Sequence, residues 1–380
     1  MFYATVPPLP RPVRKVGAPL AALIAMGTVA ALILILVTAV SPAGAVLGFS
    51  LSTVAMACVL LCYLWLDRWE PEPPRLLIMA FLWGASVAVL LSVIFEQVLH
   101  TAIEGPGQEP GFTTMAIVAP VVEEAAKGLF LVLMMTGRRR NELNTLTDCL
   151  VYAGFTAVGF AWLENIFYIA GGENLATSLA TAVMRLVMGP FAHPLFTTFT
   201  AIGVYYALKQ RSAMAKAGAL LLGYLAAVLM HALWNGSALL GSTTYLGVYV
   251  VWMMPVFALA ITLAVMSRRR EGRIIAGKLP GMISAGLLTP VEASWVSSLP
   301  ARKAAVRNAR QFGGRQAASS VKRFTTQVVE LAYVRDRIDR GFGDERVFTL
   351  QNEEVQAVMA ARAAAGPVLR QLGGVRFPAH

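Results

Sequence analysis

Apolar stretches long enough to cross a lipid bilayer recur along the first 267 residues of this sequence. A spanning α-helix needs about 20 predominantly apolar residues. Charged residues make up only 14% of the chain, against roughly a quarter in a soluble domain. The predicted fold class is therefore all-α, a polytopic membrane helix bundle. We predict about eight spanning helices, near 18–40, 45–66, 76–99, 113–136, 148–170, 183–208, 217–240 and 244–266.

The charges of the connecting loops indicate how these helices are oriented. Basic residues occur in alternate loops, at Arg11, Arg14, Lys15, Arg68, Arg75, Arg138, Arg139, Arg140, Lys209, Arg211, Lys216 and Arg268–Arg270. The intervening loops, 41–44, 100–112, 171–182 and 241–243, contain no Lys or Arg. Since cytoplasmic loops carry the excess of Lys and Arg, both termini are predicted to be cytoplasmic. Arg185, at the outer end of the sixth span, departs from this pattern, and we expect it to snorkel to the interface.

The sequence changes character after residue 267, which predicts two domains. Residues 1–267 hold 13 Lys/Arg and 12 Asp/Glu, whereas residues 268–380 hold 19 and 9. We predict a transmembrane domain at 1–267 and a small basic, cytoplasmic, helical tail at 268–380. Thr289-Pro290 has the composition of a helix start, and Gly313-Gly314, Gly341 and Gly366 are expected to break the helices that follow. The basic excess favours the anionic inner leaflet as partner, and no nucleic acid is expected.

Three ionisable residues lie within the fourth predicted span. Glu123, Glu124 and Lys127 are spaced so that the lysine can reach either carboxylate, at i+4 or i+3. Ionisable groups in the bilayer core are costly and are functional candidates by default. If one carboxylate pairs with Lys127, the other is available as a general acid or base. The alternative is a structural ion-pair cluster that holds helices together.

Polar residues also interrupt the next three spans. These residues are Glu164 and Asn165 in span five, His193 in span six, and His231 with Asn235 in span seven. His193 stands between Pro190 and Pro194, and a helix interrupted in this way survives in a membrane where the freed carbonyls line a cavity or find partners. His231 and Asn235 share one helix face.

The membrane depth of these residues suggests a common site. Counted from the outer end of each span, Glu123, Glu164, His193 and His231 lie about six to ten residues deep. At about 1.5 Å per residue the depths are roughly 9–15 Å. We therefore predict one buried site in the outer half of the bilayer, reachable by water from outside.

In their order and spacing these residues resemble the PrsW family of intramembrane proteases. The resemblance rests on Glu123-Glu124-x-x-Lys127, Phe160-x-x-x-Glu164-Asn165, His193 and His231-x-x-x-Asn235, and extends to the acidic loop from Asp67 to Pro73. It covers about residues 60–265. The pattern is also similar to the CAAX-prenyl endopeptidases and their Abi-type relatives. Glu164 stands where those proteins have a histidine, which favours PrsW.

The resemblance implies hydrolysis of peptide bonds inside a bacterial plasma membrane. Its implied substrate is a single-span membrane protein, such as an anti-sigma factor in stress signalling. The implied catalytic residues are Glu123, Glu124, His193, His231 and Asn235, with Lys127, Glu164 and Asn165 in supporting roles.

Two chemistries fit these residues. In one, Zn²⁺ is bound by His193, His231 and a carboxylate, Glu164 or Glu123. In the other there is no metal: Glu123 activates water and His231 with Asn235 stabilises the oxyanion. Two other classes of protein are alternatives. An ion- or proton-coupled transporter also carries intramembrane Glu, Lys and His, but the motifs have no counterparts in the other half of the chain. A catalytically silent scaffold or sensor is the third class.

Overall fold

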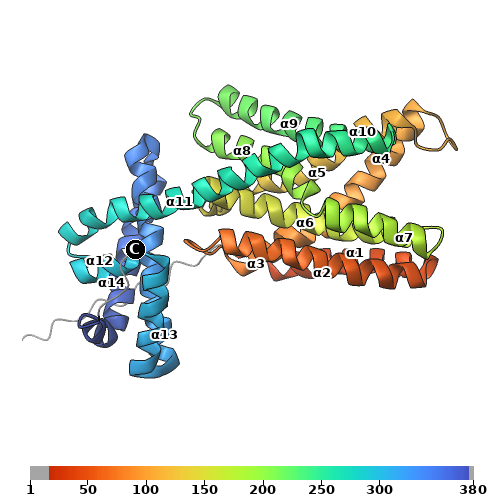
Figure 1. The fold of residues 1–380 in the computed structure, drawn as a ribbon. Coiled ribbons are helices and arrows are strands. Elements are labelled where there is room, and N and C mark those ends of the chain that lie inside the picture. Colours follow the sequence, from red (N-terminus) through yellow and green to blue (C-terminus); the bar gives the residue numbers. More distant parts are fainter. Residues whose placement is uncertain (1–16, 376–380) are drawn as a thin grey trace, which may run out of the picture. The chain divides into compact units, whose positions relative to one another are not determined.

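The computed structural model describes residues 17–375, and every regular element in that range is a helix (Figure 1). The chain forms two compact units, which are described separately. Among the described residues, one unit comprises 17–67 and 72–267. The other contains 68–71 and 268–375.

Seven helices of the described residues are long and apolar enough to cross a membrane, which confirms the predicted polytopic helical bundle. They are Leu20–Val40 (α1), Pro42–Leu66 (α2), Pro74–Ile103, Leu146–Ala170 (α6), Leu175–Leu208, Ala213–Leu239 (α9) and Ser242–Ser284. Three of them consist of two α-helical parts joined by a π-helical segment. Pro74–Ile103 is made of α3 (Pro74–Leu82), η1 (Trp83–Ala88) and α4 (Val89–Ile103), and Leu175–Leu208 of α7 (Leu175–Ala182), η4 (Val183–Met188) and α8 (Ala192–Leu208). Ser242–Ser284 is made of α10 (Ser242–Val248), η5 (Tyr249–Met253) and α11 (Met254–Ser284).

Seven helices of the described residues meet the criteria of length and composition, one fewer than the number of about eight predicted. The segment expected at 113–136 is helical, as η2 (Thr114–Val118) followed by α5 (Ala119–Met134). Its length of roughly 30 Å, at about 1.5 Å per residue, is enough to cross hydrocarbon. It contains three charged residues, Glu123, Glu124 and Lys127, whereas the most apolar stretch of each of the other seven holds at most two. The basic residues Arg11, Arg14 and Lys15, on which part of the orientation argument rests, lie outside the described residues.

Helix α6 lies at the centre of the first unit. Of its most apolar stretch, 94% of the residues are buried, whereas in α1, α9 and the Ser242–Ser284 helix the buried share is 17% or less. A helix that is apolar all round and buried must be surrounded by other helices. The elements packed around α6 are α2, α3, η1, α4, α5, α7 and α8. This arrangement places the C-terminal half of α6, with Glu164, beside α5 and α8, which carry other polar residues of the predicted site.

Glycine permits the closest approach to α6. A Cβ atom on Gly159 would lie 2.0 Å from the Phe81 carbonyl oxygen, and one on Gly84 would lie 1.9 Å from the Thr156 carbonyl oxygen. Both contacts are with backbone, which cannot move aside as a flexible side chain can. Gly159 and Gly84 thus permit close packing of these helices. Next to this contact, Trp83 Nε1 donates to the Ala126 carbonyl oxygen over 3.0 Å, which ties η1 to α5.

The sixth predicted span is interrupted just before His193. The π-helical segment η4 ends at Met188, and α8 begins at Ala192 after a turn that contains Pro190. The interruption expected at Pro190 is therefore present. Pro194 lies in the first turn of α8, where its missing N–H is tolerated. His193 consequently occupies the start of a helix, beside backbone groups freed by the interruption.

The second unit is helical, as predicted for the tail. Besides the end of α11 it contains α12 (Pro290–Val296), α13 (Leu299–Arg337), η6 (Ile338–Phe342) and α14 (Glu345–Leu372). Thr289 caps α12 in a capping box with Glu292, as the Thr-Pro start predicted. Gly313 and Gly314 interrupt α13, but α14 continues through Gly366, so the break expected there is wrong.

Candidate active site

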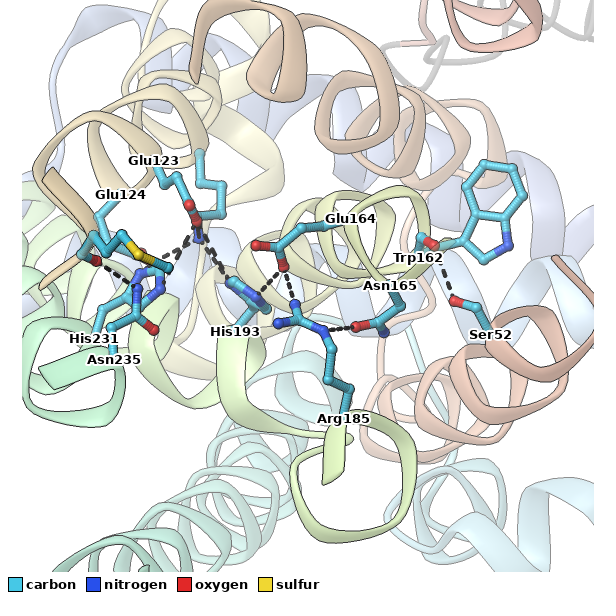
Figure 2. Close-up of polar contacts among 12 residues, drawn as sticks. Ser52, Glu123, Glu124, Trp162, Glu164, Asn165, Arg185, His193, His231 and Asn235 are labelled. Carbon is cyan, nitrogen blue, oxygen red and sulfur yellow. Dashed lines mark hydrogen bonds and ion pairs between the residues drawn. The ribbon is translucent and has the colours of Figure 1, made fainter. Parts of the chain in front are cut away.

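Six ionisable side chains from four helices meet inside the first unit (Figure 2). They are Glu123, Glu124 and Lys127 of α5, Glu164 of α6, His193 of α8 and His231 of α9. Lys127 and Glu124 are fully buried, and the other side chains are 14% exposed or less. The structure thus brings together the polar groups that the depth argument assigned to one site.

Lys127 lies between the two adjacent glutamates. Its Nζ is 2.6 Å from Glu124 Oε1 and 3.4 Å from Glu123 Oε2, so the predicted contact with both carboxylates is confirmed. Nζ is also 3.0 Å from His193 Nδ1. Because an ammonium group only donates hydrogen bonds, Nδ1 of His193 must be the unprotonated ring nitrogen.

Glu124 is held by three donors. Besides Lys127, Thr197 Oγ1 donates to its Oε2 over 3.0 Å, and His231 Nδ1 lies 3.1 Å from its Oε1. A buried carboxylate with this set of partners is fixed in position. Glu123 is bound less tightly, since its nearest charged partner is Lys127 at 3.4 Å.

The two imidazole rings each turn one nitrogen to a carboxylate and the other toward Glu123. His193 Nε2 is 2.7 Å from Glu164 Oε2, and His231 Nδ1 is paired with Glu124. The opposite nitrogens, His193 Nδ1 and His231 Nε2, are each 3.9 Å from Glu123 Oε2. Assigned from these partners, both unprotonated nitrogens face the same carboxylate oxygen.

Glu123, His193 and His231 form a group that fits a metal ion. One ligand atom from each lies within 4.8 Å of the others, and two imidazoles with one carboxylate are a donor set that Zn²⁺ uses in catalytic sites. Metal-binding histidines usually donate their other N–H to a carboxylate or carbonyl, as both rings do. The two histidines are thus grouped with Glu123 rather than with Glu164, the other carboxylate considered from the sequence. The Lys127 ammonium already contacts two of the three donors.

The two asparagines of the sequence motifs bond to neighbouring groups. Asn235 Nδ2 donates to the Met115 carbonyl oxygen over 3.0 Å, which connects α9 to η2. Asn165 is buried, and its Oδ1 accepts from Arg185 Nε over 2.7 Å. The predicted oxyanion role of Asn235 stays a prediction.

Arg185 belongs to the cluster, so the expectation that it snorkels to the interface is wrong. Its guanidinium donates to Glu164 Oε2 and to Asn165 (Figure 2). It also lies 4.1 Å from the centroid of the Tyr168 ring. In the sequence, Arg185 stands out because the loops at that end of the spans contain no other Lys or Arg.

Glu96 of α4 is a further carboxylate close to the cluster. It interacts electrostatically with Glu164, Lys127 and Glu123. Its Oε1 is buried and makes no hydrogen bond within the described part of the chain. A buried oxygen without a donor is costly, so Glu96 is available to a ligand of the site.

Part of the chain is similar to a known protein family. Residues 72–260, about half of the chain, match the model of the PrsW family intramembrane metalloproteases. The proteins named Protease PrsW of Clostridioides difficile and Geobacillus kaustophilus are 31% and 30% identical to the chain over 147 and 154 residues. Protease PrsW of Oceanobacillus iheyensis is 27% identical over 182 residues.

These alignments cover only part of each protein. They include 38%, 40% and 48% of this chain, and 60%, 63% and 79% of the respective relatives. The chain thus spans about three fifths of the length of the first two relatives. No solved structure is significantly similar to it.

Proposed function

The segment of residues 72–260 is a PrsW-family domain, and on that premise we propose that this multi-pass membrane protein is an intramembrane peptidase. Its reaction is hydrolysis of a peptide bond in a membrane-spanning protein substrate. The observation that carries the proposal is the buried group of Glu123, His193 and His231, with a carboxylate behind each imidazole.

We further propose that this group holds a divalent cation, Zn²⁺. The charges of the cluster support a divalent ion. Four carboxylates, Glu96, Glu123, Glu124 and Glu164, stand against two cations, Lys127 and Arg185, if all are ionised and the histidines are neutral. An uncompensated charge in a buried site is costly, and one divalent cation would balance this excess. When bound, the ion would polarise the scissile carbonyl and activate a water molecule.

The role of each carboxylate in the reaction would depend on how many hydrogen bonds hold it in place. Glu124 has three donors and Glu164 has two, so these carboxylates orient the imidazoles rather than transfer protons. Glu123 would be a ligand of the cation. Glu96, whose Oε1 makes no hydrogen bond within the described residues, is the group to take a proton from the attacking water and to return it to the leaving amine.

The substrate we propose is a single-span membrane protein, of which an anti-sigma factor is an example. A helix must be unwound before its peptide bonds can be cut. The turn before α8 supports this, because it brings freed backbone groups beside His193.

We also propose that α5 is an eighth span, that both termini are cytoplasmic and that the basic tail contacts the anionic inner leaflet. A C-terminal fusion should then fluoresce as green fluorescent protein and be inactive as periplasmic alkaline phosphatase; the reverse result would contradict this orientation.

Cleavage of single-span bacterial membrane proteins in proteoliposomes tests the peptidase. The wild type would be compared with Glu123→Gln and His231→Ala, and with Arg138→Met as a control at an exposed position of η3 (Gly137–Glu142). Cleavage should be lost in the first two variants and kept in the third. Chelation should abolish cleavage and added Zn²⁺ should restore it. Cleavage that survives thorough chelation would replace the metal with direct activation of water by Glu123, and proton-coupled flux without cleavage would favour a transporter.

A further inference from the structure

The second unit contains a pocket that has no part in the proposed peptidase reaction. It encloses about 660 Å³, a volume within the range of small-molecule sites in proteins. One wall is formed by residues 285–292, which connect α11 to α12 and begin α12. The other wall is a face of α14 between Met359 and Gly373. Both walls belong to the same unit, so the pocket is a feature of that unit alone.

Two unusual residues in the middle of α14 keep the face toward this pocket open. The helix continues through Gly366 and Pro367, although neither residue favours a helix interior. Gly366 lines the pocket and has no side chain to fill it. Pro367 has no N–H to donate to the carbonyl oxygen of Ala363, which also lines the pocket. Helix stability does not account for this pair of residues, whereas a binding pocket would.

The charged side chains of the pocket leave one positive charge without a partner. They are Glu292 of α12 and two arginines of α14, Arg362 and Arg370. Arg362 Nε lies 3.3 Å from Glu292 Oε2, so these two charges compensate each other. Arg370 makes no ion pair or hydrogen bond with any other described residue, and its Nη1 lies 3.9 Å from the ideal Cβ position of Gly366. Its guanidinium therefore lies at the open part of the face and can bind an anionic group.

Much of the remaining lining is apolar, and part of it is exposed. Leu287 and Leu369 are buried, whereas Val291 and Met359 are exposed. Neither α12 nor α14 is among the helices long and apolar enough to span a membrane. Exposed apolar side chains around a concave surface are typical of binding sites, and methionine adapts to ligands of different shape. An acyl chain would remove this apolar surface from water, which is favourable.

We propose that this pocket binds a single-chain anionic amphiphile, a free fatty acid, with its carboxylate on Arg370 and its acyl chain against Val291 and Met359. One uncompensated arginine matches one carboxylate, and the planar guanidinium can bind both carboxylate oxygens at once. The pocket has room for one acyl chain with a small head group and not for a two-chain phospholipid. Fatty-acid binding by the second unit does not depend on the proposed peptidase, so the two proposals can fail separately.

Photolabelling of the full chain tests this site. The protein would be reconstituted in phosphatidylcholine nanodiscs and irradiated with a fatty acid that carries a diazirine, and mass spectrometry would identify the labelled peptides. We expect label within 285–292 and 359–373. Excess unlabelled dodecanoate should reduce this label at least tenfold. Dodecanol, which has the same chain without the charge, should compete at least tenfold less well.

Three variants separate the charge of the pocket from its space. Arg370→Met should lower the label at least tenfold, because the partner of the carboxylate is lost. Ala363→Leu should lower it as strongly by filling the pocket, and it should fold normally because leucine is favourable at an exposed helix position. Arg310→Met, at an exposed position of α13, removes the same charge elsewhere and should leave the label unchanged.

Three results would overturn the proposal. The first is label confined to the spanning helices, which is what partition of the probe into the bilayer would give. The second is equal competition by dodecanoate and dodecanol, or equal label in Arg370→Met and the wild type. The third is loss of label from the pocket alone when phosphatidylglycerol replaces part of the phosphatidylcholine, which would make a membrane phospholipid the occupant. Label that persists in those nanodiscs supports a free fatty acid.

Discussion

His231 Nδ1 lies 3.1 Å from Glu124 Oε1, and this contact turns the unprotonated Nε2 of the ring toward Glu123 Oε2, 3.9 Å away. The pair joins α9 to α5 across the site, with the Phe196 ring stacked on the imidazole at 4.7 Å. Glu124 is therefore placed to orient the histidine. Its neighbour in sequence, Glu123, instead faces the unprotonated nitrogens of both imidazoles.

Replacing Glu124 with glutamine tests this division of roles. The amide cannot accept from Thr197, Lys127 and His231 together, so the imidazole should lose its fixed orientation. We expect Co²⁺ affinity and kcat/KM to fall 10–100-fold, with residual cleavage still measurable. Glu123→Gln, measured beside it, should abolish cleavage. Equal and complete loss in both variants would contradict an orienting role for Glu124.

Lys127 should be the residue whose loss most destabilises the site. It is fully buried between two carboxylates, and removing one partner of a buried ion pair typically costs about 3–5 kcal/mol. Lys127→Met should therefore lower the melting temperature in detergent strongly. The double variant with Glu124→Gln should recover part of the loss, because one unpaired charge is removed with its partner. Additive losses in the double variant would show that the two side chains are not coupled.

The close approach of α6 to η1 and α3 predicts a steric effect at Gly159. Alanine there would place Cβ 2.0 Å from the Phe81 carbonyl oxygen, and such overpacking typically costs about 1–3 kcal/mol. Gly27→Ala is the control, since Gly27 lies mid-helix in α1 with open space around its Cβ position. It should be neutral or stabilising by up to about 1 kcal/mol. Thermal unfolding in detergent compares the two, and equal melting temperatures would count against the packing.

The buried Tyr152–Glu72 contact should contribute to stability and not to chemistry. Tyr152 Oη donates to Glu72 Oε2 over 2.6 Å, in the acidic loop that resembles a family feature. Tyr152→Phe leaves that oxygen without this donor and should cost about 1–3 kcal/mol of unfolding free energy. We expect kcat per folded molecule to be unchanged. Tyr206→Phe, at an exposed position, controls for loss of a hydroxyl. A tenfold fall in kcat for Tyr152→Phe would instead assign the loop a part in catalysis.

The sequence by itself determined the membrane bundle and most of the residues that meet in the site. Apolar length is a property of each segment alone, because burial in lipid requires about 20 apolar residues wherever the helix lies. The spacing of Glu123, Glu124 and Lys127 on one helix likewise fixed their ion pairs. The turn at Pro190 followed from the ring that removes a backbone donor.

Only the tertiary structure decided how these side chains pair across helices. Four carboxylates and two histidines can be matched in many ways, and the choice depends on the rotation of each helix about its own axis. That rotation is set by packing around α6, including the contact at Gly159, which spacing along the sequence does not encode. The pairing of Glu164 with His193, the inward turn of Arg185 and the proximity of Glu96 therefore emerged only with the fold. The span that contains α5 was predicted from its apolar length, although its three charged residues set it apart from the most apolar stretches of the other seven spans.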